Sequence, residues 1–297
     1  MSNGKVRAGL AIIAFFVLLA IAGPVIASAT LHVSATAIDP QQSLLPPSAA
    51  HPLGTTQVGQ DVFAQLMTGA RISLLIGLIS GLIATTLAVL AGVSAGYLGG
   101  KADAALSAFT NVFLVLPGLP LLIIIASYVK GRGGWLIIAL IIGLTSWPWA
   151  ARQKRAQTLS LRHRDFVTAA EQIGERRWRI IIFEVIPNLA PLISSTFVTA
   201  VVAGIFADAG LDFIGVGDVN VVSWGTMMYW AENAQALSQG AWWWFTAPGA
   251  CIALIGAAGG LVNFGVDEIS NPRLRAAART NARTRRAVPA RRKAVSA

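Results

Sequence analysis

The sequence is poor in charge and almost free of cysteine. Charged residues make up 12% of its 297 residues, against roughly 25% in a typical soluble domain. Hydrophobic residues make up 55%, and the mean hydropathy is +0.65. The single cysteine, Cys251, lies in an apolar run, so the chain holds no disulfide framework. This composition excludes an ordinary soluble domain and predicts a chain that is embedded in lipid.

The sequence also lacks the motifs with which a chain performs chemistry by itself. It has no Gly-x-x-x-x-Gly-Lys-Ser/Thr loop to hold nucleotide phosphates and no His-Glu-x-x-His zinc pair. Its histidines, His32, His51 and His163, are scattered along the chain. We therefore expect no catalytic residue, no cofactor and no metal site in this chain, and we do not expect it to be an enzyme.

Long apolar runs predict an all-α membrane protein with six transmembrane helices, because a helix of about 20 residues crosses a bilayer. The expected spans are residues 8–30, 72–98, 104–129, 135–151, 189–213 and 245–264. They lie in a transmembrane domain of residues 8–275 that follows a short terminus, 1–7, and contains a polar loop, 152–188. An arginine-rich tail, 276–297, should be disordered and solvated. The sequence Ala27-Ser28-Ala29 leaves open that the first run is a cleaved signal peptide.

Basic residues are distributed very unevenly between the two sides of these spans. The six spans place 20 of the 23 lysines and arginines on one side. Because basic residues accumulate on the cytoplasmic side, both termini are expected in the cytoplasm of a multi-pass inner-membrane protein. The same bias explains the net charge of +10 and predicts contact with anionic membrane lipid rather than nucleic acid.

A charged, amphipathic island at residues 164–188 interrupts the apolar runs. Asp165 can cap a short helix, and Gly174 is placed to end it, since a left-handed C-cap costs glycine little. The apolar side of this helix should carry Phe166, Ala169, Ala170 and Ile173. A second short segment should follow and be stopped by Pro187; its apolar side should carry Trp178, Ile181, Ile182 and Val185.

Two short helices around a glycine at the cytoplasmic face predict a docking surface for another protein. The small pair Ala169 and Ala170 lets the backbone of a partner come close. The residues that we expect to make this contact are Asp165, Thr168, Ala169, Ala170, Glu171, Gly174, Trp178 and Pro187.

Two acidic residues and a proline inside the spans are candidates for lining a translocation pathway. Asp208 and Asp212 are four residues apart and so share one helix face, and acidic residues in spans usually face the bundle interior or water. Pro117 interrupts the third span. The alternatives left open are that the two acids are hydrated at the end of their span and that Pro117 is a packing kink.

Four stretches resemble, in order, the motifs of one known family. Thr168-Ala169-Ala170, Gly174 and Pro187 are spaced as in its coupling loop, which reads E-A-A, three residues, Gly, nine residues, I-x-L-P, although Thr168 replaces its Glu. The other three stretches are 51–74, 208–227 and 263–275. Together they resemble the inner-membrane permease subunits of bacterial ABC importers of the oligopeptide/dipeptide/nickel type, specifically the C-type permease subunit.

The resemblance implies the type I ABC importer permease fold, with six spans and a cytoplasmic coupling-helix loop. It implies that a second homologous permease, two ATPase subunits or domains and an extracytoplasmic binding protein complete an ATP-driven importer. ATP and magnesium would be bound by the ATPase partners. The expected cargo is di- or oligopeptide, with oligosaccharide or nickel as alternatives. Outside the family, the alternatives are an ion-coupled secondary transporter that uses Asp208 and Asp212, and an intramembrane enzyme or structural membrane protein.

Overall fold

The computed structural model describes residues 4–29, 35–129 and 134–270. Within these ranges the regular elements are helices joined by loops, and the described residues contain no strand beyond one isolated bridge between Thr55 and Asp61. The helices are α1 (Gly4–Ala29), α2 (Val62–Leu98), α3 (Gly100–Val115), α4 (Gly118–Val129), α5 (Gly134–Ser146), α6 (Pro148–Leu161), α7 (Asp165–Gln172), α8 (Arg177–Arg179), α9 (Ile186–Phe213), α10 (Trp224–Asn233) and α11 (Trp242–Ser270), with a 3-10 turn η1 (Pro40–Gln42) and a π-helical turn η2 (Ile180–Val185).

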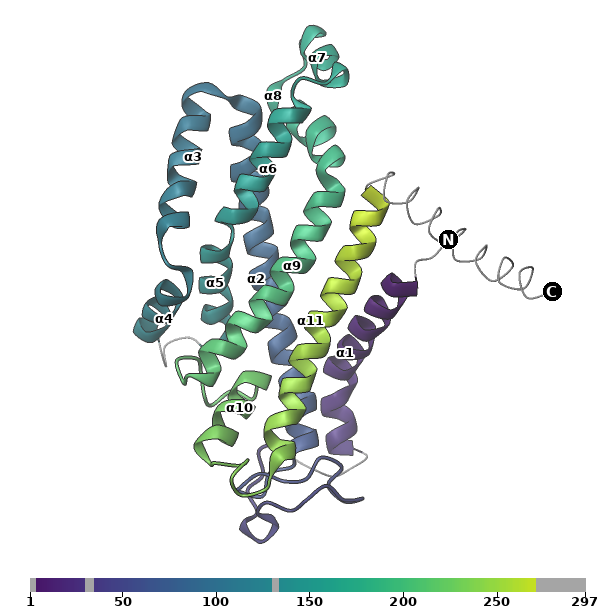
Figure 1. Cartoon of the computed structure of the whole chain (residues 1–297), viewed down its shortest axis with the longest axis vertical. Helices are drawn as coiled ribbons and strands as arrows, with labels where there is room; N and C mark the ends of the chain where they lie inside the picture. The colour runs from purple at the N-terminus through teal and green to yellow at the C-terminus, as the bar shows by residue number, and fades with distance from the viewer. Residues whose placement is uncertain (1–3, 30–34, 130–133, 271–297) are drawn as a thin grey trace, which may run out of the picture.

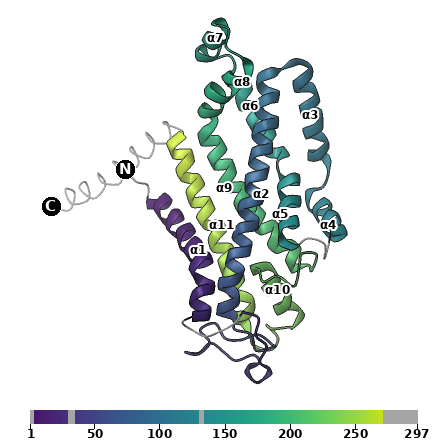
Figure 2. The same ribbon diagram turned by 180° about the vertical axis from the view of Figure 1, so that it is seen from behind.

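Helix α2 runs the length of the bundle and packs against α1, α5, α6 and α9 (Figures 1 and 2). It begins ten residues before the expected span, because Asp61 caps it by accepting a 2.8 Å hydrogen bond from the Ala64 N–H. Glycines allow the close approach of its neighbours. A Cβ at Gly81 would lie 2.6 Å from Val201 of α9, and one at Gly92 would lie 2.3 Å from the backbone of Ala151 on α6. Small residues thus hold the bundle together, as in other membrane helices.

Four helical segments are long and apolar enough to cross a membrane, or six if two bent pairs each count as one span. The first, second, fifth and sixth spans are continuous helices, although each differs in its bounds from the expected range. The expected third span, 104–129, is not one helix, because α3 and α4 meet at an 83° bend where Pro117 lies. The expected fourth span ends too early: after a 40° bend, α6 continues to Leu161, into the range assigned to the loop.

The two ends of the bundle differ in construction. Helices α7 and α8 project at one end, whereas the loop before α2 and helix α10 cover the other (Figure 1). Helices α1 and α11 lie side by side along one edge (Figures 1 and 2). The expected basic tail, 276–297, lies outside the described residues.

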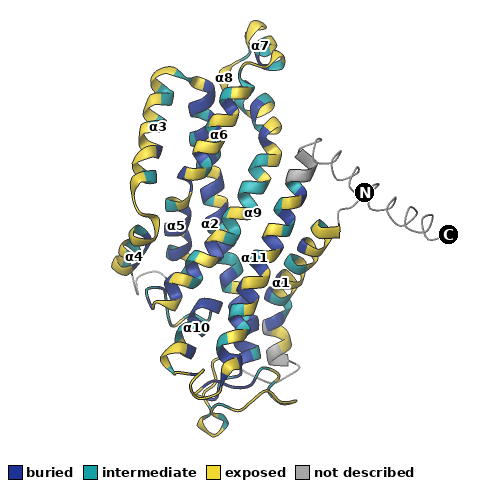
Figure 3. Ribbon diagram, viewed as in Figure 1, coloured by how far each residue is buried: buried dark blue, intermediate teal, exposed yellow. Residues whose placement is uncertain are grey.

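Burial follows the packing of a membrane protein. Buried positions concentrate on α2 and on the faces turned toward it, while the outer faces of α1, α3 and α4 are exposed (Figure 3). Large apolar side chains lie on these exposed faces, among them Leu18, Val115 and Tyr128. Such a continuous apolar exterior is what a bilayer or a second membrane subunit covers.

Candidate coupling segment and buried acidic pair

Helix α7 differs from the sequence expectation at its start and in its faces. It begins at Asp165, so Arg164 occupies the N-cap position and Asp165 is not the cap. Its acidic side chain instead lies in the first turn, where the helix dipole favours negative charge. Val167 is the fully buried residue of the helix, whereas Ala169 is exposed and Ile173 is 79% exposed. The four residues expected on one apolar side therefore divide: half-buried Phe166 and Ala170 pack with Val167 against the subunit, whereas Ala169 and Ile173 face away from it.

Inward contacts attach α7 to the end of α2. Val167 packs in a cluster with Val93 and Tyr97, both on α2, and half-buried Ala170 packs against the same cluster. The Tyr97 hydroxyl donates a 2.8 Å hydrogen bond to the Glu171 carboxylate. The sequence predicts Glu171 in the contact set but does not single out Tyr97, although a tyrosine at the end of a span is a usable signal.

Gly174 ends α7, as expected. Its φ is +81°, and its N–H donates to the carbonyl of Glu171 while the next N–H, of Glu175, donates to the carbonyl of Ala170. These two bonds form a Schellman motif, which requires a left-handed residue at this position. No atom lies within 4 Å of a Cβ placed on Gly174, so the constraint here is the backbone angle and not space.

Replacing Gly174 with valine should loosen this turn. A non-glycine residue in the left-handed region costs about 1–2 kcal/mol, so the open form of the turn should become roughly tenfold more populated. Limited trypsin digestion of the purified protein should then cut faster at Arg176 and Arg177, while Gly174→Asn, which tolerates this angle better, should lie between valine and wild type. Equal protection of all three proteins would contradict this reading of the turn.

The second segment also departs from expectation. Of the residues expected on its apolar side, Val185 is buried and Ile181 packs in the same cluster, whereas Trp178 and Ile182 are 53% and 47% exposed. Buried Ile180 was not among those expected. Pro187 does not stop a helix either, because Arg177–Phe213 is one continuous helical segment. In the π-helical turn η2 the Ile186 N–H donates five residues back, to Ile181, and Pro187 follows at the first turn of α9, where its missing N–H is tolerated.

An exposed groove lies between the two segments. It has a volume of about 530 Å³ and is lined by Ile173, Gly174, Glu175, Arg176, Trp178, Arg179 and Phe183. The Arg179 guanidinium lies 5.8 Å from the centre of the Phe183 ring, and its Nε is 3.3 Å from the Glu175 carboxylate. Ala169 and Thr168 lie on the neighbouring helix, with the Thr168 hydroxyl donating to the Asp165 carbonyl at 3.0 Å. Apolar surface and charged groups thus face outward together, which suits a protein partner.

Asp208 and Asp212 are enclosed in the subunit, with 1% and 4% of their surface exposed. The alternative that both are hydrated at the end of the span is wrong. Asp212 accepts a hydrogen bond from the Ser223 hydroxyl, whereas both carboxylate oxygens of Asp208 have no hydrogen-bond partner among the described residues. They share with Ser223 a cavity of about 10 Å³, which is room for one water molecule. Their role in a pathway stays a prediction, as does that of Pro117, which is exposed at the bend between α3 and α4.

The sequence does not reveal the environment of two charged groups on α6. Lys154 is fully buried, and its ammonium has no hydrogen-bond partner in the part of the chain that the structure describes. Arg155 pairs with Asp103 on α3 through two hydrogen bonds of 2.5 and 2.7 Å. The buried residues Ala151, Lys154 and Thr158 are spaced along one face of α6. This spacing could have indicated a helix, but the sequence prediction assigns residues 152–188 to the loop.

A family model matches residues 88–276, which is most of the chain and includes α7, the π-helical turn and both buried acids. Its description is "Binding-protein-dependent transport system inner membrane component". The chain belongs to this family. The all-α architecture is accordingly the type I ABC permease fold, and the expected resemblance is confirmed. As an inner-membrane component of this family, the protein is an integral membrane permease of an ABC importer, and such components are not themselves the catalytic subunits.

Individual relatives cover most of this inner-membrane component. The dipeptide transport system permease protein of Bacillus subtilis (strain 168) is 34% identical over 279 residues, which are 92% of this chain and 83% of the relative. The probable D,D-dipeptide transport system permease protein of Escherichia coli (strain K12) is 33% identical over 80% of this chain and 78% of its own length. The oligopeptide transport system permease protein of Mycobacterium bovis is 31% identical over 77% and 78%.

Proposed function

We propose that this permease subunit forms, with a homologous permease, the membrane pathway of an ATP-driven importer of di- and oligopeptides. The observation that supports the cargo is the 34% identity to a dipeptide permease across 92% of this chain. The alternatives of oligosaccharide, nickel and ion-coupled transport have no comparable support, since the relatives described above are named for peptide transport. We further propose that this chain catalyses nothing and that ATP and magnesium are bound by the ATPase partners.

Residues 164–188 couple this subunit to an ATPase subunit in our proposal. The groove between α7 and α8 presents Ile173, Trp178 and Phe183 at exposures of 79%, 53% and 61%, which is apolar area that a docked partner would remove from water. Arg176 and Arg179 flank it and would select an acidic edge on the partner. Gly174 holds the two segments at a fixed angle, and exposed Ala169 lets the partner's backbone approach α7.

Movement of a docked ATPase would reach the membrane through α2. The buried Val167 and the hydrogen bond between Tyr97 and Glu171 attach α7 to α2, and α2 packs against four other long helices. A displacement of α7 would therefore move the bundle as a rigid body, and not one helix alone, which is the kind of motion that alternating access requires.

The complete machine would include two ATPase subunits or domains, the second permease and an extracytoplasmic binding protein. The distribution of basic residues, with 20 of 23 expected on one side of the spans, supports cytoplasmic termini and an extracytoplasmic position for α10 and for the loop before α2. Asp208, Asp212 and Pro117 remain our candidates for residues near the pathway.

Reconstitution tests this proposal. The chain, the second permease and the ATPases are placed in liposomes, and uptake of a radiolabelled dipeptide is measured with the binding protein present. We expect uptake that needs ATP and every component, with matched liposomes that lack the ATPases as the control. Uptake by this chain alone would overturn the proposal, and so would ATP-driven uptake of a sugar or nickel but not of peptide.

A further inference from the structure

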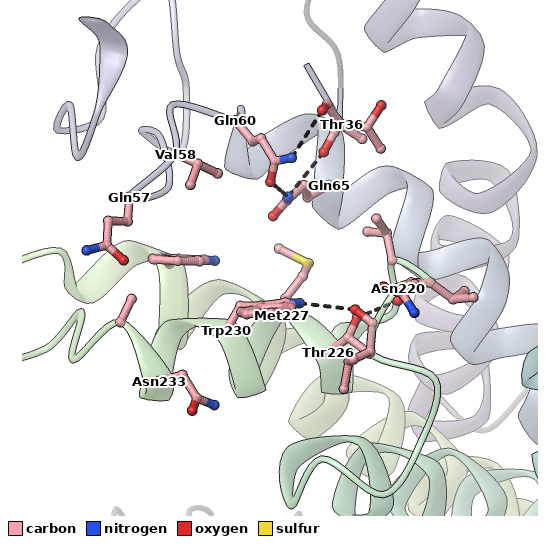
Figure 4. Close-up of a pocket in the computed structure, with 16 residues that line it drawn as sticks. Thr36, Gln57, Val58, Gln60, Gln65, Asn220, Thr226, Met227, Trp230 and Asn233 are labelled. Atoms are coloured by element: carbon pink, nitrogen blue, oxygen red, sulfur yellow. Dashed lines mark hydrogen bonds between the residues drawn. The ribbon is translucent and has the colours of Figure 1, made fainter. Parts of the chain in front are cut away.

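A pocket of about 410 Å³ opens at the end of the bundle opposite α7. Its walls come from the loop before α2, from the start of α2, from the loop after α9 and from α10 (Figure 4). Its volume lies in the range of pockets that hold small molecules or side chains. In the proposed orientation it faces the extracytoplasmic side.

None of the sixteen residues that line the pocket carries a charge. Instead, five carboxamide side chains contribute to the wall: Gln57, Gln60, Gln65, Asn220 and Asn233. Each carboxamide offers both a donor and an acceptor, the same two groups that a peptide bond offers. The lining therefore matches an uncharged, amide-rich ligand.

Several of these groups are already fixed in place. The Gln65 side-chain N–H donates to the side-chain oxygen of Gln60 at 2.7 Å, and the Gln60 side-chain N–H donates to the backbone carbonyl of Thr36 at 3.1 Å (Figure 4). Asn233 donates to the Tyr229 carbonyl at 2.8 Å, which leaves its side-chain oxygen as an acceptor. The carboxamide of Gln57 makes no hydrogen bond within the described ranges and is exposed.

Two tryptophans contribute to the apolar part of the wall, together with valines, alanines and Met227. The Trp230 indole is anchored by donating to the Val219 carbonyl at 3.1 Å. Trp244 is only 5% exposed, yet its indole N–H has no acceptor among the residues that the structure describes. A buried donor without an acceptor costs about 1–3 kcal/mol.

We propose that this pocket receives an uncharged loop of the extracytoplasmic binding protein, held through its backbone amides; this inference rests on the proposed function. A free dipeptide carries an ammonium and a carboxylate at its ends, and transferring these charges into a pocket without a charged partner is costly. An internal loop of a folded protein brings peptide groups without charged ends. The lining thus favours the docking protein over its cargo.

Photo-crosslinking in the complete complex tests the occupant. A photoreactive amino acid replaces Gln57 or Asn233, and a matched probe replaces Gln41, an exposed glutamine of the same loop that does not line the pocket. After illumination during ATP-driven uptake, mass spectrometry identifies the crosslinked polypeptide. We expect an uncharged internal loop of the binding protein at Gln57 and Asn233 but not at Gln41. A crosslink to the transported peptide, or equal labelling at Gln41, would overturn the proposal.

Adding a charge to the pocket tests the contact independently. Gln57→Glu and Asn233→Asp keep the size of the side chain, and Gln41→Glu adds the same charge outside the pocket. Gln57→Glu breaks no side-chain hydrogen bond among the described residues, whereas Asn233→Asp also removes the donor to the Tyr229 carbonyl, so the thermal unfolding midpoint is measured for both. We expect the pocket variants to bind the binding protein roughly tenfold more weakly, because a carboxylate would face backbone carbonyls of the loop. Binding unchanged from the Gln41→Glu control would contradict the inference. The wild-type complex must bind and transport peptide in the same experiment, and its failure to do so would instead refute the proposed function.

Discussion

Replacing Ala169 with arginine should lower ATP-driven uptake at least about tenfold while the protein stays in the membrane at wild-type abundance. Ala169 is exposed on α7 next to the proposed docking groove, so a long side chain there projects outward and leaves the packing of Val167 and Ala170 intact. It would hold the partner's backbone away from the helix. Loss of about 1.4 kcal/mol of docking energy already means a tenfold loss of complex, and we expect uptake to fall by at least roughly that factor. Uptake in proteoliposomes and co-purification of the ATPase measure it.

Two variants control for size and charge. Ala169→Ser keeps the side chain small and should transport normally, and Gln157→Arg adds the same charge at an exposed position of α6. Ala170→Arg would be a poorer test, because half-buried Ala170 packs inside the subunit and its replacement also disturbs α7 itself. If Ala169→Arg retained the ATPase and transported normally, residues 164–188 would not be the coupling contact.

Replacing Trp224 with alanine should destabilise the fold more than the replacement of any other tryptophan on α10 or at the start of α11. Its side chain is fully buried, its indole donates to the Leu66 carbonyl at 3.1 Å, and its ring meets Phe16 edge to face at 5.4 Å. It therefore joins α10 to both α2 and α1. Removal of such a side chain costs about 3–5 kcal/mol and leaves the Leu66 carbonyl without this donor.

The thermal unfolding midpoint of the detergent-purified protein measures this effect. Trp242→Ala is the matched control, because Trp242 is 57% exposed at the start of α11 and its loss should change the midpoint little. We expect the Trp224 variant to unfold at a clearly lower temperature and to accumulate less in membranes. Equal midpoints for the two variants would mean that the joint between α10 and the bundle contributes little to stability.

The sequence was sufficient for the class of fold because lipid imposes a simple rule. A chain without charge over about 20 residues must bury its backbone polar groups in a helix, so the continuous spans were predictable from hydropathy. The bends were not, since the 83° angle at Pro117 depends on what packs around it. The sequence does indicate the start of α2, because Asp61 has the chemistry of an N-cap residue and caps the helix in the structure, although the expected span begins only at residue 72. The Asp61 side chain also binds the ring of His51 at 2.8 Å.

The candidate site was predictable in position but not in orientation. Motif spacing located Gly174 and the residues around it, because a left-handed C-cap has a strong preference for glycine. The inward face of α7 was predicted only in part, because Ala169 and Ile173 look as apolar in a helical projection as Phe166 and Ala170, whereas the structure packs only the latter two, with Val167, against the subunit. An amphipathic pattern cannot distinguish a face that packs on its own subunit from one that awaits a partner. The pocket beside Trp230 was invisible in the sequence, since its carboxamides come from segments far apart in the chain.

The bend between α3 and α4 has a consequence for the thickness of the subunit. At 1.5 Å per residue, the 16 residues of α3 reach about 24 Å along their axis. After a turn of 83°, α4 adds only about 2 Å in that direction, so this corner falls short of a hydrocarbon layer of about 30 Å. The deficit lies beside exposed Val115 and Leu119. Taken alone, the subunit is therefore shorter than the hydrocarbon layer at α3 and α4. Either the membrane is thinner there, or a neighbouring subunit spans the remaining thickness.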